Sequence, residues 1–229
     1  MRRRRPGSSL SDAALTLVWQ SASLLLDYPD ESLPERLPLL RAASHQVDEP
    51  IGSLLRRVVD HVAATPLPQL QADYVETFDN RRRCNLFLTY FAHGDTRKRG
   101  MALLRFKQTY LRSGFVLDDS ELPDHLCVVL EFAATVDREA GRALMLENRA
   151  GLELLRLSLR DAGSPWAPAL EAVTATLPPL RGDEQDAVRR LVLEGPPEEE
   201  VGLAPFATPE LSPSAPTLLP MPTFPGARS

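Results

Sequence analysis

Cysteine is scarce in this chain, with only 2 among 229 residues, Cys84 and Cys127. So few cysteines exclude a disulfide scaffold, and both lie in segments with an apolar helical pattern. We therefore expect free, buried thiols and a reducing compartment, which makes the cytoplasm the expected location. Long apolar runs are also lacking, because none approaches the roughly 18 residues that a membrane span needs. We expect no stable insertion into a membrane.

Positive charge is not in excess either, because 26 Lys and Arg face 31 Asp and Glu, for a formal net charge of −5 and a pI of about 5.5. Such a chain is not drawn to phosphate backbones, so nucleic acid is not an expected partner. Strand signals are missing too: we find no alternating β-branched run bounded by turns and no Asn-Gly or Asp-Gly pair. With 43% apolar residues, the chain can still bury a core, and helices must build it.

Catalytic motifs are absent as well, since the sequence has no GxSxG, HExxH, paired CxxC, GxGxxG or P-loop pattern. His93, His125, Cys84 and Cys127 are the imaginable zinc ligands, but only His125 and Cys127 are close in sequence. Two residues apart, they point to different sides of a helix. We therefore expect no enzymatic activity, no metal and no cofactor.

The N-terminus resembles an export signal, because four arginines at positions 2–5 precede an apolar run. That run is interrupted by polar residues such as Gln20 and Ser23, and it ends in Asp27-Tyr28-Pro29 without a small-residue cleavage site. Its apolar residues instead follow the spacing of an amphipathic helix. We expect a first core helix that follows a disordered basic arm.

Helical periodicity recurs through the rest of the chain, with Ser11 or Asp12 as the first cap and glycines such as Gly94 and Gly114 at helix ends. Two of the expected helices run over about 70–78 and over the apolar segment 85–92. Gly151 is interpreted as a break or a close-packing point. The predicted class is all-α: a basic arm at 1–10, a single compact multi-helix domain at 11–194 and a disordered Pro-rich tail at 195–229. Nine of the last 35 residues are proline, which excludes a regular helix there.

Two polar clusters are candidates for binding. Six basic residues between positions 97 and 112 form either a solvated helix face or a surface for an acidic or phosphorylated partner. In the ELPDHL block at 121–126, Asp124 either caps a helix start or joins His125 in a polar clamp for a peptide. We place Pro123 in the first turn of that helix.

Three blocks of residues carry a resemblance to a known family: YVETFD at 74–79, LFLTYFAHGDTRKRG at 86–100 and ELPDHLCVVLEF at 121–132. In this order they closely resemble the NarJ-type nitrate reductase assembly chaperones, also called the delta subunit, within the wider TorD/DmsD helical chaperone family. The resemblance covers residues 11–193. It implies an all-helical, cytoplasmic chaperone that is not an enzyme.

The resemblance also implies partners. The chain would bind the N-terminal segment of the nitrate reductase catalytic (alpha) subunit and keep the apoenzyme competent for molybdenum cofactor insertion and membrane assembly. Proteins of molybdenum cofactor biosynthesis are further implied partners. The implied peptide-binding residues are Tyr74, Phe78, Arg97, Arg99, Glu121, Pro123, Asp124 and His125.

Three other functions remain open from the residues alone. An enzyme or metal protein would use His93, His125 and nearby carboxylates. A nucleotide-binding module would use the basic cluster at 97–112. A chaperone of the same fold would serve a different molybdoenzyme, such as an N-oxide or sulfoxide reductase; the GDTRKRG block disfavours this alternative.

Overall fold

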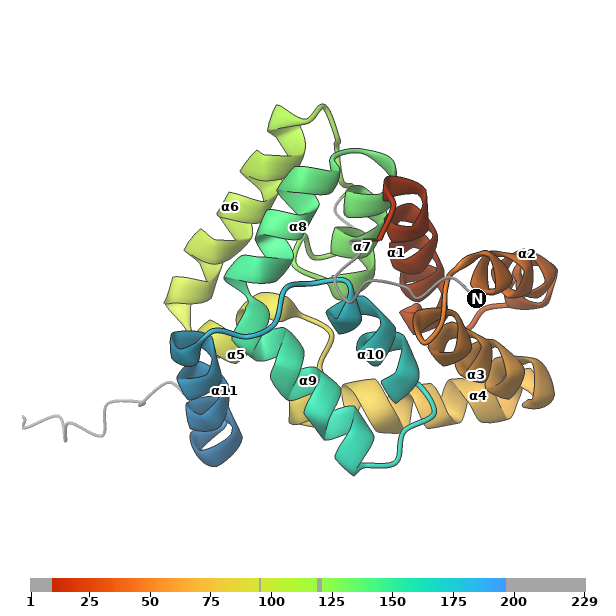
Figure 1. The fold of residues 1–229 in the computed structure, drawn as a ribbon. Helices are drawn as coiled ribbons and strands as arrows, with labels where there is room; N and C mark the ends of the chain where they lie inside the picture. The colour runs from red at the N-terminus through yellow and green to blue at the C-terminus, as the bar shows by residue number, and fades with distance from the viewer. Residues whose placement is uncertain (1–9, 95, 119–120, 197–229) are drawn as a thin grey trace, which may run out of the picture. The chain divides into compact units, whose positions relative to one another are not determined.

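Regular structure in this protein is helical throughout the residues that the computed structural model describes, 10–94, 96–118 and 121–196 (Figure 1). The elements are α1 (Asp12–Leu26), α2 (Leu33–Gln46), α3 (Ile51–Ala64), α4 (Leu67–Tyr74), a π-helix (Val75–Asp79), a 3-10 turn (Arg82–Cys84), α5 (Leu88–His93), α6 (Arg97–Arg112), α7 (Leu126–Thr135), α8 (Arg138–Glu147), α9 (Arg149–Asp161), α10 (Ala167–Ala175) and α11 (Gly182–Glu194). The predicted all-α class is confirmed. Almost all of the predicted basic arm and of the predicted Pro-rich tail lies outside the described residues.

The ends of several helices are set by the residues that the sequence suggested. The Ser11 hydroxyl accepts a hydrogen bond from the Ala14 amide at 3.2 Å and so caps α1. Gly94 ends α5 and Gly114 follows α6, with φ angles of 56° and 74°. Positive φ is unfavourable for residues that carry a Cβ, so glycine is the suitable residue at both turns.

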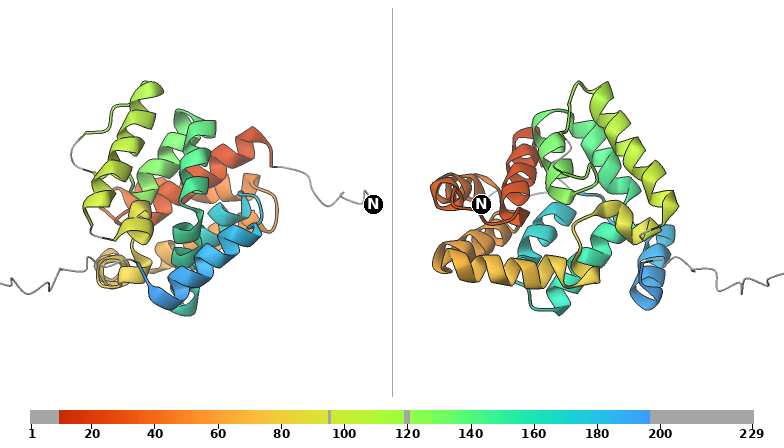
Figure 2. Two further views of the ribbon diagram at one scale, coloured as in Figure 1. Left: turned by 90° about the vertical axis from the view of Figure 1, so that its left-hand side faces the viewer. Right: turned by 180° about the vertical axis from the view of Figure 1, so that it is seen from behind.

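The core is built around α7 and α10. Helix α7 packs against α1 and α8, and α10 packs against α1, α3 and α9 (Figures 1 and 2). The indole Nε1 of Trp19 donates a hydrogen bond to the Thr176 hydroxyl at 2.9 Å, which ties α1 to the end of α10. Ser23 donates to the carbonyl of Cys127 at 2.9 Å, which ties α1 to α7. Both of these bonds fix long-range contacts inside an otherwise apolar interior.

Close helix packing explains a glycine that the sequence left ambiguous. A Cβ atom at Gly151 would lie 2.7 Å from the Cβ atom of Phe91, so α9 and α5 touch at this point. The close-packing interpretation is therefore confirmed. The break between helices falls three positions earlier, at Asn148, where α8 ends and α9 begins.

Two predicted helices have different bounds from those expected. The helical pattern at 70–78 belongs to α4, which passes directly into the π-helix Val75–Asp79. The apolar segment at 85–92 becomes helical only at Leu88, because the residues before it pair with the chain at 124–126. Among the described helices, none has both the length and the apolar character needed to cross a bilayer.

Candidate functional site

The first half of the predicted site, Tyr74 and Phe78, forms the edge of a buried aromatic cluster. Their ring centroids lie 4.6 Å apart, and each packs against the indole of Trp166, at 5.9 and 5.5 Å. The change from α-helix to π-helix after Tyr74 sets the relative position of the two rings. Only 6% of Tyr74 and 5% of Phe78 is exposed. These two rings therefore have little accessible surface for a ligand to contact. They form a buried aromatic layer, which we call the floor of the site.

Tyr28, which the sequence did not single out, covers this floor from the solvent side. Its ring meets the Tyr74 ring edge to face at 5.4 Å, and 47% of the residue is exposed. The Tyr74 hydroxyl donates to the carbonyl of Leu26 at 3.0 Å, which holds the end of α1 against the floor. Burial raises the pKa of Tyr74, and the charges of Cys127, Asp27, Asp79 and Glu121 act in the same direction.

Asp124, in the second half of the predicted site, is fully buried at 0% exposure. Its Oδ2 accepts hydrogen bonds from the backbone amide and the hydroxyl of Thr89, at 3.1 and 2.5 Å. Arg99 donates from Nε to the same hydroxyl at 3.2 Å, and its Nη2 lies 3.6 Å from Asp124 Oδ2. Asp124 Oδ1 is also buried, without a hydrogen-bond partner among the described residues. Asp124 thus anchors α5 and α6 to the start of α7.

Asp124 is not a helix cap, and Pro123 does not lie in the first turn of a helix. Helix α7 begins at Leu126 with His125 as its N-cap residue. Pro123 is buried in the turn before it, and its carbonyl accepts a hydrogen bond from the Tyr110 hydroxyl at 2.6 Å. The capping alternative for Asp124 is therefore wrong, because its carboxylate accepts hydrogen bonds from the Thr89 amide and hydroxyl instead.

His125 is half-buried and packs against Phe87. Its ring meets Phe87 edge to face at 5.1 Å, and the Arg99 guanidinium carbon lies 5.5 Å from the centroid of the same Phe87 ring. Burial lowers the pKa of His125 below its usual value, although the carboxylates of Glu121, Asp27 and Asp124 oppose this effect. The imidazole is thus neutral at pH 7 and can both donate and accept a hydrogen bond.

The two halves of the predicted site share neighbours. The charges of Asp27 and Glu121 act on both Tyr74 and His125, so these four groups lie in one electrostatic neighbourhood. Asp27 and Glu121 are both exposed. Arg97 is exposed on α6, and no described hydrogen bond, ion pair or ring contact joins it to the other predicted residues. Its place in the site stays a prediction.

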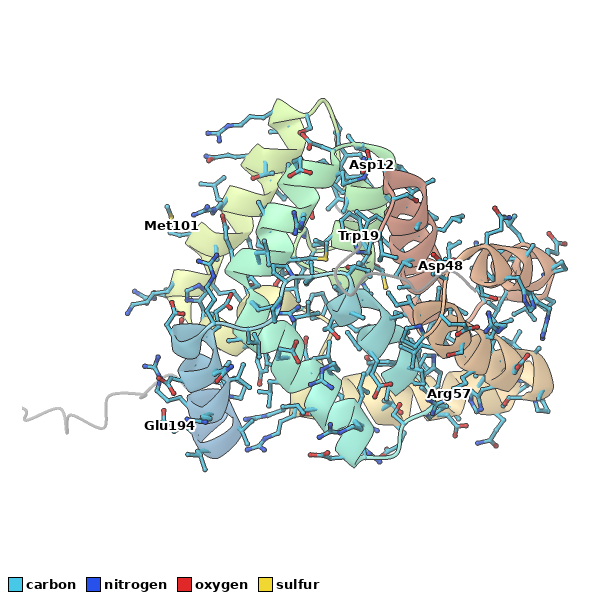
Figure 3. All side chains as sticks on the ribbon, viewed as in Figure 1. Asp12, Trp19, Asp48, Arg57, Met101 and Glu194 are labelled. Atoms are coloured by element: carbon cyan, nitrogen blue, oxygen red, sulfur yellow. The ribbon has the colours of Figure 1, made fainter. Side chains whose placement is uncertain are left out.

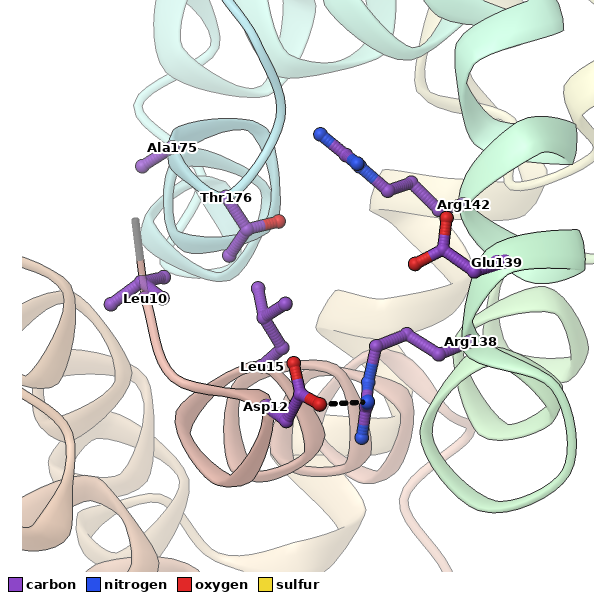
Figure 4. A pocket seen from close by; sticks show the side chains of 8 residues that line it. All are labelled: Leu10, Asp12, Leu15, Arg138, Glu139, Arg142, Ala175 and Thr176. Atoms are coloured by element: carbon purple, nitrogen blue, oxygen red, sulfur yellow. Dashed lines mark ion pairs between the residues drawn. The ribbon is translucent and has the colours of Figure 1, made fainter. Parts of the chain in front are cut away.

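One cavity lies apart from the predicted site residues. A pocket of about 330 Å³ lies between α1, α8 and α10 (Figure 4). Arg138 pairs there with Asp12 at 2.8 Å, and Arg142 points toward the opening from the same wall. Within the described residues, no three His, Cys, Asp or Glu side chains converge as the ligands of a metal ion would.

Comparison with known proteins gives a consistent family. The family described as nitrate reductase delta subunit matches residues 42–172. The nitrate reductase-like protein NarX of Mycobacterium tuberculosis is 41% identical over 160 residues, which is 70% of this chain and 24% of NarX. This chain therefore spans about a quarter of the length of that relative.

Shorter relatives match over more of their length. A protein of Bacillus subtilis, named as a probable nitrate reductase molybdenum cofactor assembly chaperone NarJ, is 34% identical over 70% of this chain and 88% of its own. A crystal structure from Archaeoglobus fulgidus, described as a candidate redox enzyme maturation protein, has a TM-score of 0.52 and 22% identity. It covers 76% of this chain and 98% of that one, and it supports the fold.

Proposed function

Since this chain belongs to the nitrate reductase delta subunit family, we propose that it is an assembly chaperone for a nitrate reductase. In this proposal it binds the N-terminal segment of the catalytic subunit and keeps the apoenzyme open to insertion of the molybdenum cofactor. We assign the role to residues 11–194, an extent supported by the family match over 42–172 and by the helices from α1 to α11. The cofactor is cargo of the client, so the chaperone needs no reactive group of its own.

One observation supports the peptide-binding part: an exposed aromatic residue, Tyr28, packs on a buried aromatic floor, and the charges of Asp27 and Glu121 act on that floor. We call this the Tyr28 surface and define it by Asp27, Tyr28, Val75, Glu121 and His125. Tyr28 and Val75 are 47% and 37% exposed, which is unusual for apolar groups beside a core. Apolar anchors with a few polar groups at their border are the pattern of a peptide groove.

The charges of the Tyr28 surface favour a basic client. Asp27 and Glu121 are acidic and exposed, and Asp79 of the π-helix also acts on Tyr74. His125, kept neutral by burial, adds no opposing charge. An amphipathic client helix with Lys or Arg beside its apolar face would complement these groups. Asp124 acts as a positioning residue in this proposal, because it is buried and its carboxylate holds Thr89 of α5 against the start of α7.

The test is isothermal titration calorimetry with a peptide of the client's N-terminus. We expect Tyr28→Ala to weaken binding at least tenfold, because it removes the exposed anchor while leaving the buried floor intact. Glu121→Gln should weaken binding less, and the loss should shrink at high salt. Leu193→Ala, at an 82% exposed position on α11, is the matched control and should bind as the parent does.

The site assignment would be wrong if Tyr28→Ala and a folded Asp124→Ala/His125→Ala double variant both kept the parent's affinity. The choice of client is tested separately. A peptide from an N-oxide or sulfoxide reductase that bound more tightly than the nitrate reductase peptide would favour a chaperone of the same fold for a different molybdoenzyme. The buried thiols of Cys84 and Cys127 fit a reducing compartment, and we propose the cytoplasm as its place of action.

A further inference from the structure

Helix α6 has a charge opposite to that of the rest of the chain. Its 16 residues, RKRGMALLRFKQTYLR, include six Lys or Arg and no Asp or Glu. The whole chain has a formal net charge of −5. A basic patch on an acidic protein gives the molecule a charge asymmetry that would orient it toward an anionic partner.

The buried side of α6 is narrow. Phe106 and Tyr110 are 2% and 1% exposed and fix the helix to the core. On the outward side, Met101, Leu104 and Leu111 are 71%, 45% and 61% exposed. At about 100° per residue, these three side chains fall on one strip of the helix surface. Figure 3 shows Met101 pointing away from the molecule. The exposed Gln108 falls on the same strip, so three of its four exposed positions from Met101 to Leu111 are apolar.

Cations border the apolar strip. The same helical spacing places Lys98, Arg105 and Arg112 along one side of it and Lys107 on the other. Arg105 pairs with Glu147 of α8. Lys98 and Arg112 form no ion pair with any described residue, so their charges are available to a partner. Long Lys and Arg stems can lie along an apolar surface while their charged ends reach an anionic one.

The position of α6 indicates the shape of that partner. The helix runs along an edge of the helical assembly in all views (Figures 1 and 2). A single convex helix with an apolar strip between cations suits the flat surface of a bilayer, where the strip meets the headgroup region and the cations meet the phosphates. We propose that the outer face of α6, defined by Lys98, Met101, Leu104, Leu111 and Arg112, binds the surface of an anionic lipid bilayer.

This binding is peripheral and reversible. The apolar strip enters the headgroup region and the cations face the lipid phosphates. The Tyr28 surface uses residues outside α6, so lipid binding does not depend on the proposed chaperone function. Each basic residue near an anionic surface contributes a factor of about five in affinity. Removing two should therefore weaken binding roughly thirtyfold.

The experiment is co-sedimentation of the full chain with vesicles made of equal parts phosphatidylglycerol and phosphatidylcholine, compared with phosphatidylcholine alone. We expect binding to the anionic vesicles at an ionic strength of about 0.01 M and a strong reduction at about 1 M, where the Debye length falls to about 3 Å. Lys98→Gln/Arg112→Gln should bind roughly thirtyfold more weakly. Met101→Ser/Leu111→Ser should also bind more weakly, although its charge is unchanged.

Matched controls lie on helices far from α6. Arg57→Gln on α3 removes an exposed cation (Figure 3), and Leu39→Ser on α2 removes an apolar side chain that is 69% exposed. Both should bind as the parent does, with circular dichroism confirming that every variant is folded. The proposal is overturned if anionic vesicles bind no better than neutral ones, or if the control variants lose as much as the α6 variants. Binding to polyglutamate without binding to anionic vesicles would also overturn it and would point to an acidic protein instead.

Discussion

Replacing Asp124 with alanine tests the central anchor of the site. In the structure, Oδ2 of this buried carboxylate accepts two hydrogen bonds from Thr89 and lies 3.6 Å from Arg99 Nη2. Hydrogen bonds to a charged group contribute about 1.5–3 kcal/mol each, and breaking a buried ion pair costs about 3–5 kcal/mol. These effects overlap, so they do not add. We therefore expect a loss of about 3 kcal/mol in the free energy of unfolding.

Urea unfolding followed by the fluorescence of Trp19 and Trp166 measures this loss, because both indoles are buried. Thr89→Val keeps the backbone donor and should lose only about 1 kcal/mol. Asp161→Ala, an exposed carboxylate on α9, is the control and should change stability by less than about 0.5 kcal/mol. An Asp124→Ala variant as stable as this control would refute the role of Asp124 as an anchor.

Three further predictions follow from other parts of the molecule. Gly151→Ala should lower the free energy of unfolding by about 1–3 kcal/mol, because its Cβ would lie 2.7 Å from a neighbouring side-chain atom. Gly100→Ala, with nothing within 4 Å, should raise the free energy of unfolding by about 0.5–1 kcal/mol. Urea midpoints of the two variants that shift in the same direction would contradict this pair of expectations. Because burial lowers the pKa of His125 in the folded state, the unfolded chain binds the proton more readily, so this stability is present above about pH 6.5 and is lost as the pH falls toward the folded value. His125→Gln should flatten that pH dependence in urea unfolding, and an unchanged slope would count against it. Burial also raises the pKa of Cys84 and Cys127, so neither thiol should react with a disulfide reagent until the protein unfolds, and immediate reaction of both in native buffer would show that they are accessible.

Local sequence signals predict most of the helices well. Periodicity, the Ser11 cap and the glycines at 94 and 114 depend on residues a few positions apart, and the structure agrees with them. The segment at 85–92 was harder to predict, because its apolar residues fit a helix. In the fold, Leu86 and Leu88 pair with a segment almost 40 positions later, and this long-range pairing overrides the local preference.

The candidate site shows the same division. The motifs led to Tyr74, Phe78, Asp124 and His125, but not to how they are used. Burial of the first three depends on distant partners that no local pattern reveals, such as Trp166 against the two rings. The sequence does not indicate a role for Tyr28, because it follows α1 in an irregular segment, where an aromatic residue gives no periodic signal. The motifs thus indicate which residues matter. Only the fold shows that Tyr74 and Phe78 form a buried floor, that Asp124 anchors helices and that Tyr28 is accessible.

The pair of backbone hydrogen bonds that joins 86–88 to 124–126 has a consequence for how this chain can change over time. The Leu88 amide donates to the Asp124 carbonyl at 3.0 Å, and the Leu126 amide donates to the Leu86 carbonyl at 2.9 Å. These two hydrogen bonds hold the two ends of the segment 88–124 together, and α6 lies within this segment. Substitutions on the outer face of α6 leave the two ends of this segment fixed. An insertion or deletion within α6 would instead rotate the buried Phe106 and Tyr110 away from the core. The fold thus allows the exposed positions of α6 to vary while its buried positions stay constrained.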